Sequence, residues 1–325
     1  NGTIDTEQFV NVAAEKGALV GSTLDKSKNF SIYGDNALFV KPDVALIIGL
    51  QYLHASRDRR DRFLSDGDQS GRETYDLWSP KAGVLWTVKP EWQIFANISR
   101  SVEVPSYDVN IFTNPTQLKP QRATTYEIGT RGKVSAIEWD LSLYRSEIED
   151  ELQCLTTGPF SACSAINADR TVHQGIEAGL GGSIPLAGSG DAVAFNFAYT
   201  LSDFHFDADT LYGDNELPGV PSHLLRGEML FQHRSGFYAG PNVEWSPRGY
   251  FADNANSLTV DAYALLNFKA GFDTGGNWSA YIEGRNLTNE AYISTVAIAG
   301  VADENSAIFN PGTGRSIFGG VRFSF

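Results

Sequence analysis

The connections between the expected strands constrain the fold of this chain most. Residues with period-two alternation of apolar and polar side chains recur along its length, and tight turns rich in Pro and Gly alternate with long polar connections. An antiparallel up-and-down meander with short turns at one end and long loops at the other has this arrangement. The pattern predicts about thirteen strands, at 28–40, 44–57, 77–88, 92–101, 124–134, 137–152, 172–185, 192–206, 223–233, 237–250, 260–272, 278–287 and 316–325.

Each expected strand has one apolar and one polar face. In "AVAFNFAYTLSD", for example, Val193, Phe195 and Phe197 alternate with small or polar residues. Large aromatic side chains fall on the apolar face close to the tight turns, as in an aromatic girdle at a membrane interface. The expected girdle residues are Trp86, Trp92, Trp139, Phe237, Phe272 and Trp278. We therefore expect an all-β transmembrane barrel with lipid outside and a polar lumen.

Composition excludes several classes of function. The formal net charge of -14 argues against a nucleic-acid partner. No run of residues approaches the ~20 apolar residues of a membrane-spanning helix. The sequence shows no nucleophile–base arrangement, phosphate-binding loop or metal-ligand cluster, so neither enzyme activity nor a metal or cofactor is expected.

Two cysteines occur, Cys154 and Cys163, in "CLTTGPFSAC". They flank a Gly-Pro turn and are close enough in sequence to close a small loop. In an oxidising compartment this spacing predicts a disulfide bond.

Four stretches resemble the TonB-dependent outer-membrane receptors: "SRSVEVPSYDV" (99–109), "LKPQRATTYEIGTRG" (118–132), "YIEGRNLTNEAY" (281–292) and "NPGTGRSIFGGVRFSF" (310–325). The resemblance implies a siderophore-type receptor in the outer membrane of a Gram-negative bacterium, energised by TonB. It also implies that the terminal Phe325 is the signal read by the barrel-assembly machinery. Ferric siderophores are the commonest substrate class of the family, with cobalamin, haem and oligosaccharides as further possibilities.

Members of that family have a plug domain inside a 22-stranded barrel, whereas this sequence shows no plug and no TonB-contacting box. Matched from the C-terminus, its strands correspond to the last thirteen or so of the 22. Residues 1–27 are then the end of an extracellular loop, and residues 28–325 are the C-terminal portion of the barrel. We expect an open part of a barrel with two unpaired edges.

Candidate ligand-binding residues have inward parity near the upper lumen: Arg57, Tyr144, His173, Tyr263 and Arg285. Arg57 belongs to "HASRDRRDRF" (54–63), and such arginine clusters suit anionic ligands or the lipopolysaccharide outside a barrel. The other charged groups of the inward face fit either a ligand path, a plug contact or a solvated wall.

Two other functions are compatible with the pattern. A passive porin-type channel shares the aromatic girdle and the loop asymmetry. A soluble secreted β-rich binding protein would instead bury the apolar faces in a core. The position of those faces distinguishes the second alternative from a membrane barrel.

Overall fold

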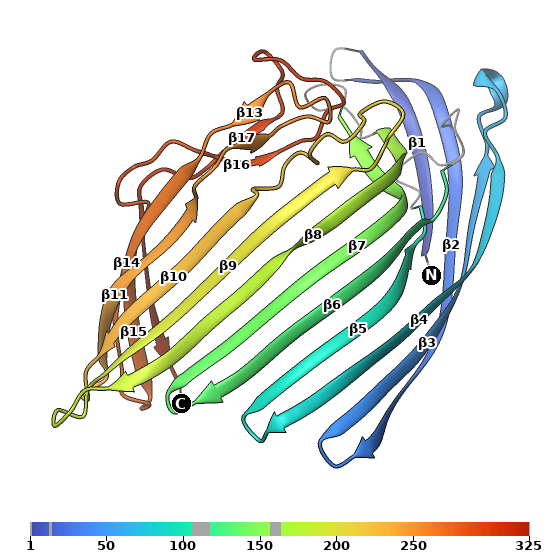
Figure 1. Cartoon of the computed structure of the whole chain (residues 1–325). Coiled ribbons are helices and arrows are strands. Elements are labelled where there is room, and N and C mark those ends of the chain that lie inside the picture. The colour runs from blue at the N-terminus through green and yellow to red at the C-terminus, as the bar shows by residue number, and fades with distance from the viewer. Residues whose placement is uncertain (1, 13–14, 106–117, 157–163, 325) are drawn as a thin grey trace.

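The computed structural model describes residues 2–12, 15–105, 118–156 and 164–324. They form one 14-stranded antiparallel sheet in which each strand pairs with its neighbours in chain order (Figure 1). The strands are β1 (Gly2–Val12), β2 (Glu15–Lys41), β3 (Val44–Asp61), β4 (Gly71–Lys89), β5 (Trp92–Glu103), β6 (Gln121–Val134), β7 (Ile137–Leu155), β8 (Ser164–Pro185), β9 (Ala192–Phe206), β10 (His223–Gln232), β11 (Phe237–Ser246), β14 (Tyr263–Asp273), β15 (Trp278–Arg285) and β18 (Ser316–Phe323).

All the strands predicted from the alternation are present, from β2 to β18. The main differences lie at the ends of the long connections, where β2, β3, β4 and β8 continue well beyond their predicted limits. Within residues 1–27, β1 and the first part of β2 form an antiparallel hairpin, from Gly2 opposite Ser27 to Val12 opposite Glu15. β2 crosses residue 28 without interruption, so the expected division there does not coincide with a change of secondary structure.

The long connections also contain short elements that the alternation does not predict. A 3-10 helix, Leu64–Asp66, lies between β3 and β4. Two further two-stranded sheets are formed by β12 (Tyr250–Phe251) with β13 (Thr259–Val260), and by β16 (Ile293–Val296) with β17 (Phe309–Pro311). None of the helices in the described residues has the length and apolarity needed to span a membrane.

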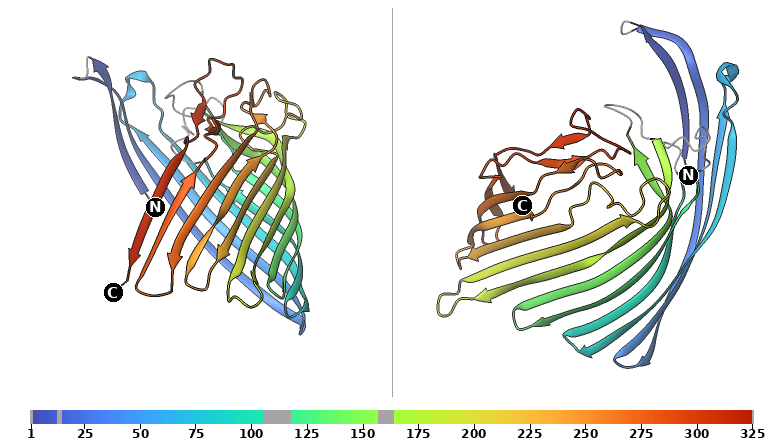
Figure 2. Two further views of the ribbon diagram at one scale, coloured as in Figure 1. Left: turned by 90° about the vertical axis from the view of Figure 1, so that its left-hand side faces the viewer. Right: turned by 45° about the horizontal axis from the view of Figure 1, so that its top comes forward.

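The sheet is open and curves like part of a barrel wall (Figure 2). β1 and β18 are its two edge strands, and the described residues show no pairing between them. This arrangement agrees with the expected open portion of a barrel. Cys154 is disulfide-bonded; its predicted partner, Cys163, and the terminal Phe325 lie outside the described residues.

Register gives the two faces of the sheet different chemistry. Polar partners face each other on one side, as Asn97 faces Glu127, whereas apolar partners such as Leu180 and Phe197 face each other on the other side. A shallow hollow of about 590 Å³ is lined by polar side chains such as Gln93, Arg131, Asp140 and Asn196 and also by the apolar Trp139 and Leu180. In outer-membrane barrels the polar face lines the lumen, so we assign the polar face as the inward one.

The apolar face remains uncovered. Phe197 is 41% exposed and Phe268 is 45% exposed, although both are large apolar side chains. A soluble protein would bury such a continuous surface. The alternative of a soluble β-rich protein, which requires these faces to form a core, is therefore not supported.

The expected girdle residues lie on this apolar face next to the short turns. Trp92 and Trp139 both pair with Gly132, and Phe237 pairs with Phe272. The Trp139 ring lies across Gly132, where an added Cβ would come within 2.5 Å of the ring. Trp278 stacks on Phe272, with ring centroids 5.5 Å apart. Trp86 donates a hydrogen bond from Nε1 to the Asp43 carboxylate in the adjacent turn, at 3.2 Å.

The two-faced sheet leads to a test with neighbouring residues of β9. In the intact protein refolded into bilayers, Phe197→Arg is expected to lower the free energy of unfolding by about 2–4 kcal/mol, because it places a cation against acyl chains. Asn196→Arg is the matched control, since Asn196 lines the hollow on the polar face. Urea titrations compare the two, and equal destabilisation would contradict the assignment of the faces.

Candidate ligand-binding site at the extracellular end

The long connections fold into a cap at one end of the sheet, at the top of Figure 1. Its hydrophobic core consists of Tyr250, Ala252, Val260, Ala299, Ala302 and Ile308, with Leu258, Ile293, Val296 and Phe309 packed around them. These residues come from two connections, β11–β14 and β15–β18. In outer-membrane barrels the long loops are extracellular, so the cap lies at the external mouth.

Asp253 holds these two connections together. Its side chain is fully buried and accepts hydrogen bonds from the Ser257 hydroxyl at 2.6 Å and from the backbone N–H groups of Ser257, Leu258 and Ala302 at 2.9–3.1 Å. Burial raises the pKa of Asp253, but these hydrogen bonds outweigh it and leave the pKa below its usual value. The carboxylate is thus held in its charged form as the acceptor at the centre of the cap.

Further hydrogen bonds join the cap to other connections. Asn254 donates from Nδ2 to Oε1 of Gln153 on β7, at 3.0 Å. Its backbone carbonyl accepts from Nδ2 of Asn215, in the β9–β10 connection, at 2.9 Å. The backbone N–H of Thr156 donates to Ile298 at 2.7 Å. Four connections are therefore fixed relative to one another.

Tyr263, one of the predicted ligand residues, lies at the cap end of β14 on the polar face. Its hydroxyl donates to Oε1 of Glu244 at 2.8 Å, and Oε2 of the same carboxylate accepts from Arg226 Nε at 2.8 Å. Its ring lies 5.0 Å from that of Tyr292. This aromatic pair with a charged neighbour could contact a planar or hydrogen-bonding ligand.

Tyr144 and His173 lie on the adjacent strands β7 and β8, where His173 is opposite Ser146, two residues along from Tyr144. Tyr144 pairs with Gly175, whose missing side chain leaves room for the tyrosine hydroxyl. His173 stacks on Phe204 at 4.3 Å, and its Nε2 lies 3.4 Å from Oε1 of Glu151. Both residues face the lumen, as predicted, and they form a second polar and aromatic group on the wall.

Arg57 is more buried than the sequence indicates, with only 5% of its surface exposed. Its guanidinium donates to the backbone carbonyl of Pro105 at 3.1 Å and to Oδ1 of Asn29 at 2.8 Å. These bonds link β2, β3 and the segment after β5. In this arrangement Arg57 supports the wall, and its role as a ligand residue stays a prediction.

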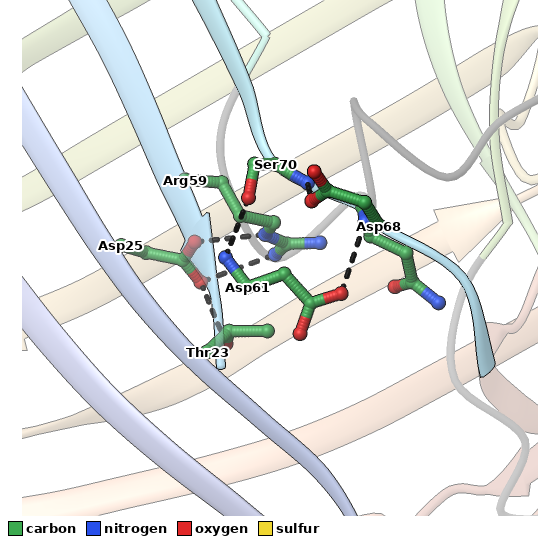
Figure 3. A network of polar contacts seen from close by, with 7 residues as sticks. Thr23, Asp25, Arg59, Asp61, Asp68 and Ser70 are labelled. Atoms are coloured by element: carbon green, nitrogen blue, oxygen red, sulfur yellow. Dashed lines mark hydrogen bonds and ion pairs between the residues drawn. The ribbon is translucent and has the colours of Figure 1, made fainter. Parts of the chain in front are cut away.

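A polar network next to Arg57 in sequence contains Arg59 and Asp61 of the same arginine-rich stretch, together with Asp25 (Figure 3). Arg59 forms a two-pronged ion pair with Asp25, at 2.8 and 3.1 Å, and both side chains are buried. Asp61 accepts from the backbone N–H groups of Phe63 and Gln69, each at 2.9 Å. The network braces the part of β2 and β3 that extends beyond the predicted strand limits.

Arg285 lies on β15, far along the sheet from Arg57 on β3. Its Nη2 donates to Oε2 of Glu283 at 2.8 Å, and its guanidinium lies over the Phe318 ring at 4.7 Å. All five predicted residues share the inward face, but they do not converge on one point. Within the described ranges, no group of three or more His, Cys, Asp or Glu residues could hold a metal ion.

Comparison with known proteins identifies the architecture. The family model "TonB dependent receptor-like, beta-barrel" matches residues 5–287. The ferric-pyoverdine BN7/BN8 receptor of Pseudomonas putida is 22% identical over 306 residues, which is 94% of this chain and 35% of that protein. The vitamin B12 transporter BtuB of Vibrio vulnificus is 39% identical over 215 residues, covering 65% of this chain and 31% of that protein. The chain thus spans about a third of the length of these relatives.

Solved structures show the same fold. The ferric yersiniabactin uptake receptor FyuA of Yersinia pestis aligns with a TM-score of 0.73 and 17% identity, over 94% of this chain and 47% of that protein. The siderophore receptor PiuA of Acinetobacter baumannii aligns with a TM-score of 0.75 and 18% identity, over 94% and 44% respectively. The matched proteins are receptors and transporters rather than enzymes, which confirms the expectation from the sequence.

The central position of Asp253 predicts the effect of removing its charge. Asp253→Asn places an NH₂ group where donors converge, and is expected to destabilise the cap locally by about 1–3 kcal/mol. Hydrogen exchange of the intact protein should then rise in residues 250–260 and 296–308. Glu304→Gln, an exposed charge in the same connection, is the control and should leave exchange unchanged. Equal hydrogen exchange in the unaltered protein, Asp253→Asn and Glu304→Gln would contradict the role of Asp253.

The lowered pKa of Asp253 also fixes the direction of the pH dependence. A carboxylate with a lowered pKa in the folded state stabilises fully above its unfolded value of about 4 and loses this contribution as the pH falls further. Exchange protection of the cap, corrected for intrinsic rates, is therefore expected to stay constant from pH 7 to pH 5 and to fall below that range. Loss of protection between pH 7 and pH 5 would contradict this account.

Proposed function

Because the chain belongs to the TonB-dependent receptor-like β-barrel family, we propose that it is the C-terminal barrel portion of a receptor that takes up a ferric siderophore. Proteins of this family reside in the outer membrane of Gram-negative bacteria, and the chain is placed there accordingly. The observation that carries the proposal is the match to ferric-pyoverdine receptors: two of them align with 94% and 84% of this chain.

The geometry supports such a role in two ways. The inward wall is polar and hydrogen-bonded, as the path of a hydrophilic iron chelate requires. The cap end of the wall carries Tyr263, which pairs with Tyr292 of the β15–β18 connection and lies beside the charged pair Arg226 and Glu244. Ligand would be held between this cap and the upper wall by hydrogen bonds and ring contacts.

Transport across the membrane would depend on parts of the receptor beyond this chain. In the proposed mechanism TonB acts on a plug domain within the complete barrel, and the released chelate passes to the periplasm. The outward apolar face contacts the acyl chains of outer-membrane lipid, including lipopolysaccharide. The passive-channel alternative requires neither TonB nor a plug.

Uptake by the full-length receptor tests the proposal. In cells that lack other ferric-siderophore receptors, iron-55 uptake is measured with ferric pyoverdine and ferric yersiniabactin as probes, with and without TonB. The proposal expects uptake of a ferric siderophore that disappears without TonB while surface binding remains. Passage of small solutes in the absence of TonB would instead support a passive channel.

Cobalamin is a second candidate, because the identity to BtuB of Vibrio vulnificus is higher, at 39%, although over a shorter part of the chain. The same cells given radiolabelled cyanocobalamin separate the two candidates. Uptake of cyanocobalamin without uptake of any ferric siderophore would replace the leading proposal.

The contribution of Tyr263 to ligand binding is testable with a matched variant. Tyr263→Phe removes a hydrogen-bonded hydroxyl at the cap end, and is expected to weaken ferric-siderophore binding about fivefold to tenfold. Tyr238→Phe makes the same chemical change on the same face near a short turn, and should leave affinity unchanged. Equilibrium binding to the full-length receptor measures both, and equal effects would remove Tyr263 from the site.

A further inference from the structure

Strands β7 and β8 extend beyond their neighbours towards the extracellular end. The pairing of β6 with β7 ends at Glu149, and the pairing of β8 with β9 ends at Thr171. Beyond these residues the ladder continues between β7 and β8. We call residues 150–155 and 164–169 the upper hairpin. The ladder that joins its two strands to β6 and β9 stops below it.

The upper hairpin is bonded to the cap. Oε1 of Gln153 accepts a hydrogen bond from Asn254 at 3.0 Å. The backbone N–H of Thr156, directly after β7, donates to the carbonyl of Ile298 at 2.7 Å. These bonds reach both connections that form the core of the cap, β11–β14 and β15–β18. The position of the upper hairpin relative to the wall therefore also sets the position of the cap.

The ladder is interrupted at the base of the upper hairpin. Glu149 pairs with Arg170 and Glu151 pairs with Ala168, but Asp150 between them forms no ladder pair. Asp150 has a φ of 53°, in the left-handed region that non-glycine residues rarely adopt. The upper hairpin is therefore joined to the wall less continuously than the strands below it.

Glu151 and His173 meet at this interruption. Glu151 accepts a hydrogen bond from the hydroxyl of the buried Thr171, and its Oε1 lies 3.4 Å from Nε2 of His173. The His173 ring is stacked on Phe204, with centroids 4.3 Å apart and planes 11° apart, which fixes its orientation. Nε2 is buried and has no hydrogen-bond partner among the described residues, an arrangement that costs free energy. The Glu151 carboxylate is thus the group that a proton on Nε2 would face.

A proton on Nε2 of His173 changes the nature of this contact. An imidazolium ring presents an N–H to the carboxylate and forms a charge-assisted hydrogen bond. A neutral ring that carries its proton on Nδ1 presents a lone pair to the same carboxylate, and the two groups then do not attract. Histidine side chains change charge between about pH 5 and pH 8, where glutamate side chains are ordinarily ionised.

The other ionisable groups around the contact are placed differently in the described part of the chain. On the inward face, Tyr144 and Glu177 lie further from the extracellular end of β7 and β8. Register places Glu147 and Asp203 on the outward face. In the upper hairpin, Asp150 pairs with Lys119, and Asp169 accepts hydrogen bonds from Thr210. The response of the contact to pH between 5 and 8 therefore depends on His173.

We propose that His173 is a positioning residue whose protonated ring binds Glu151 and holds the upper hairpin, and with it the cap, against the wall. The contact is strongest at about pH 5.5 and is lost as the pH rises through the range in which histidine side chains lose their proton. For the proposed receptor, bound ligand is then retained more strongly in mildly acidic surroundings. This last step rests on the proposed function, whereas the contact itself does not.

Hydrogen exchange of the full-length receptor without ligand tests the contact. Exchange in the upper hairpin, corrected for intrinsic rates, is compared at pH 7.5 and pH 5.5. Protection of the upper hairpin in the unaltered receptor is expected to be about tenfold higher at pH 5.5, because a hydrogen bond between charged groups contributes at least that factor. Residues 250–260 are the internal reference, since the hydrogen bonds of Asp253 lie within the cap and should keep their protection constant.

Three variants separate protonation from packing. His173→Gln keeps an amide donor but cannot take up a proton, and Glu151→Gln removes the charge of the carboxylate. Each should give equal protection of the upper hairpin at the two pH values. His205→Gln is the matched control, because Nδ1 of His205 also lies beside a carboxylate, 3.2 Å from Oδ1 of Asp203, but on the outward face of β9. This control should keep the full pH difference of the unaltered receptor.

Protection of the upper hairpin that does not change with pH in the unaltered receptor would overturn the proposal. A pH difference that survives in His173→Gln would also overturn it. Heat-modified migration on gels verifies that each variant is folded. If His173→Gln does not fold, Glu151→Gln is measured in its place, with the same expectation.

Dissociation of ferric pyoverdine from the full-length receptor extends the test to the ligand. It is expected to be slower at pH 5.5 than at pH 7.5 in the unaltered receptor, and equal at the two pH values in His173→Gln. Equal dissociation in the unaltered receptor would overturn the link to ligand retention. A receptor whose upper hairpin shows the His173-dependent pH difference but which binds no ferric siderophore would contradict only the proposed function.

Discussion

The structure depends on hydrogen bonds between backbone groups, because the hydrocarbon of a membrane contains no water that could replace them. In hydrocarbon an unpaired backbone N–H or C=O group costs several kcal/mol, so a chain that crosses lipid with strands must pair each strand on both sides. The continuous ladder from β1 to β18 meets this requirement everywhere except at its two edges. Once the strands are paired, successive side chains must point alternately to lipid and to the lumen. One face of the sheet is therefore apolar and the other polar.

Because of this alternation, the side chains of the two faces meet different chemical requirements. The outward residues, such as Phe197 and Phe268, need only be apolar. The inward residues form hydrogen-bonded pairs across strands, such as Asn97 with Glu127 at 2.7 Å and Asn267 with Asn242 at 2.7 Å. Beyond the membrane the constraint ends, and the long connections build a cap with its own core around Asp253. The outward face can carry charge there, as at Arg100 and Arg122.

The same reasoning explains what the sequence could and could not predict. Alternation located the strands from β2 to β18 because lipid on one side forces the pattern. β1 and the upper part of β2 were not predicted as strands because successive residues such as Asp5, Thr6 and Glu7 are polar, so both faces carry polar side chains there, as strands above a membrane can. The short strands of the cap and the role of Asp253 depend on contacts between distant connections, such as that from Ala302. The alternation of side chains placed Arg57 on the inward face correctly, but it could not reveal that Arg57 is buried and hydrogen-bonded to Pro105 and Asn29.

The most direct test of the account is the environment of successive residues along β9. In the full-length receptor in bilayers, single nitroxide labels at positions 195 to 200 are probed with oxygen, which partitions into lipid, and with a water-soluble nickel complex. The account predicts a period of two, with oxygen access highest at 195, 197 and 199. Accessibility without this period, or with highest oxygen access at 196, 198 and 200, would contradict it.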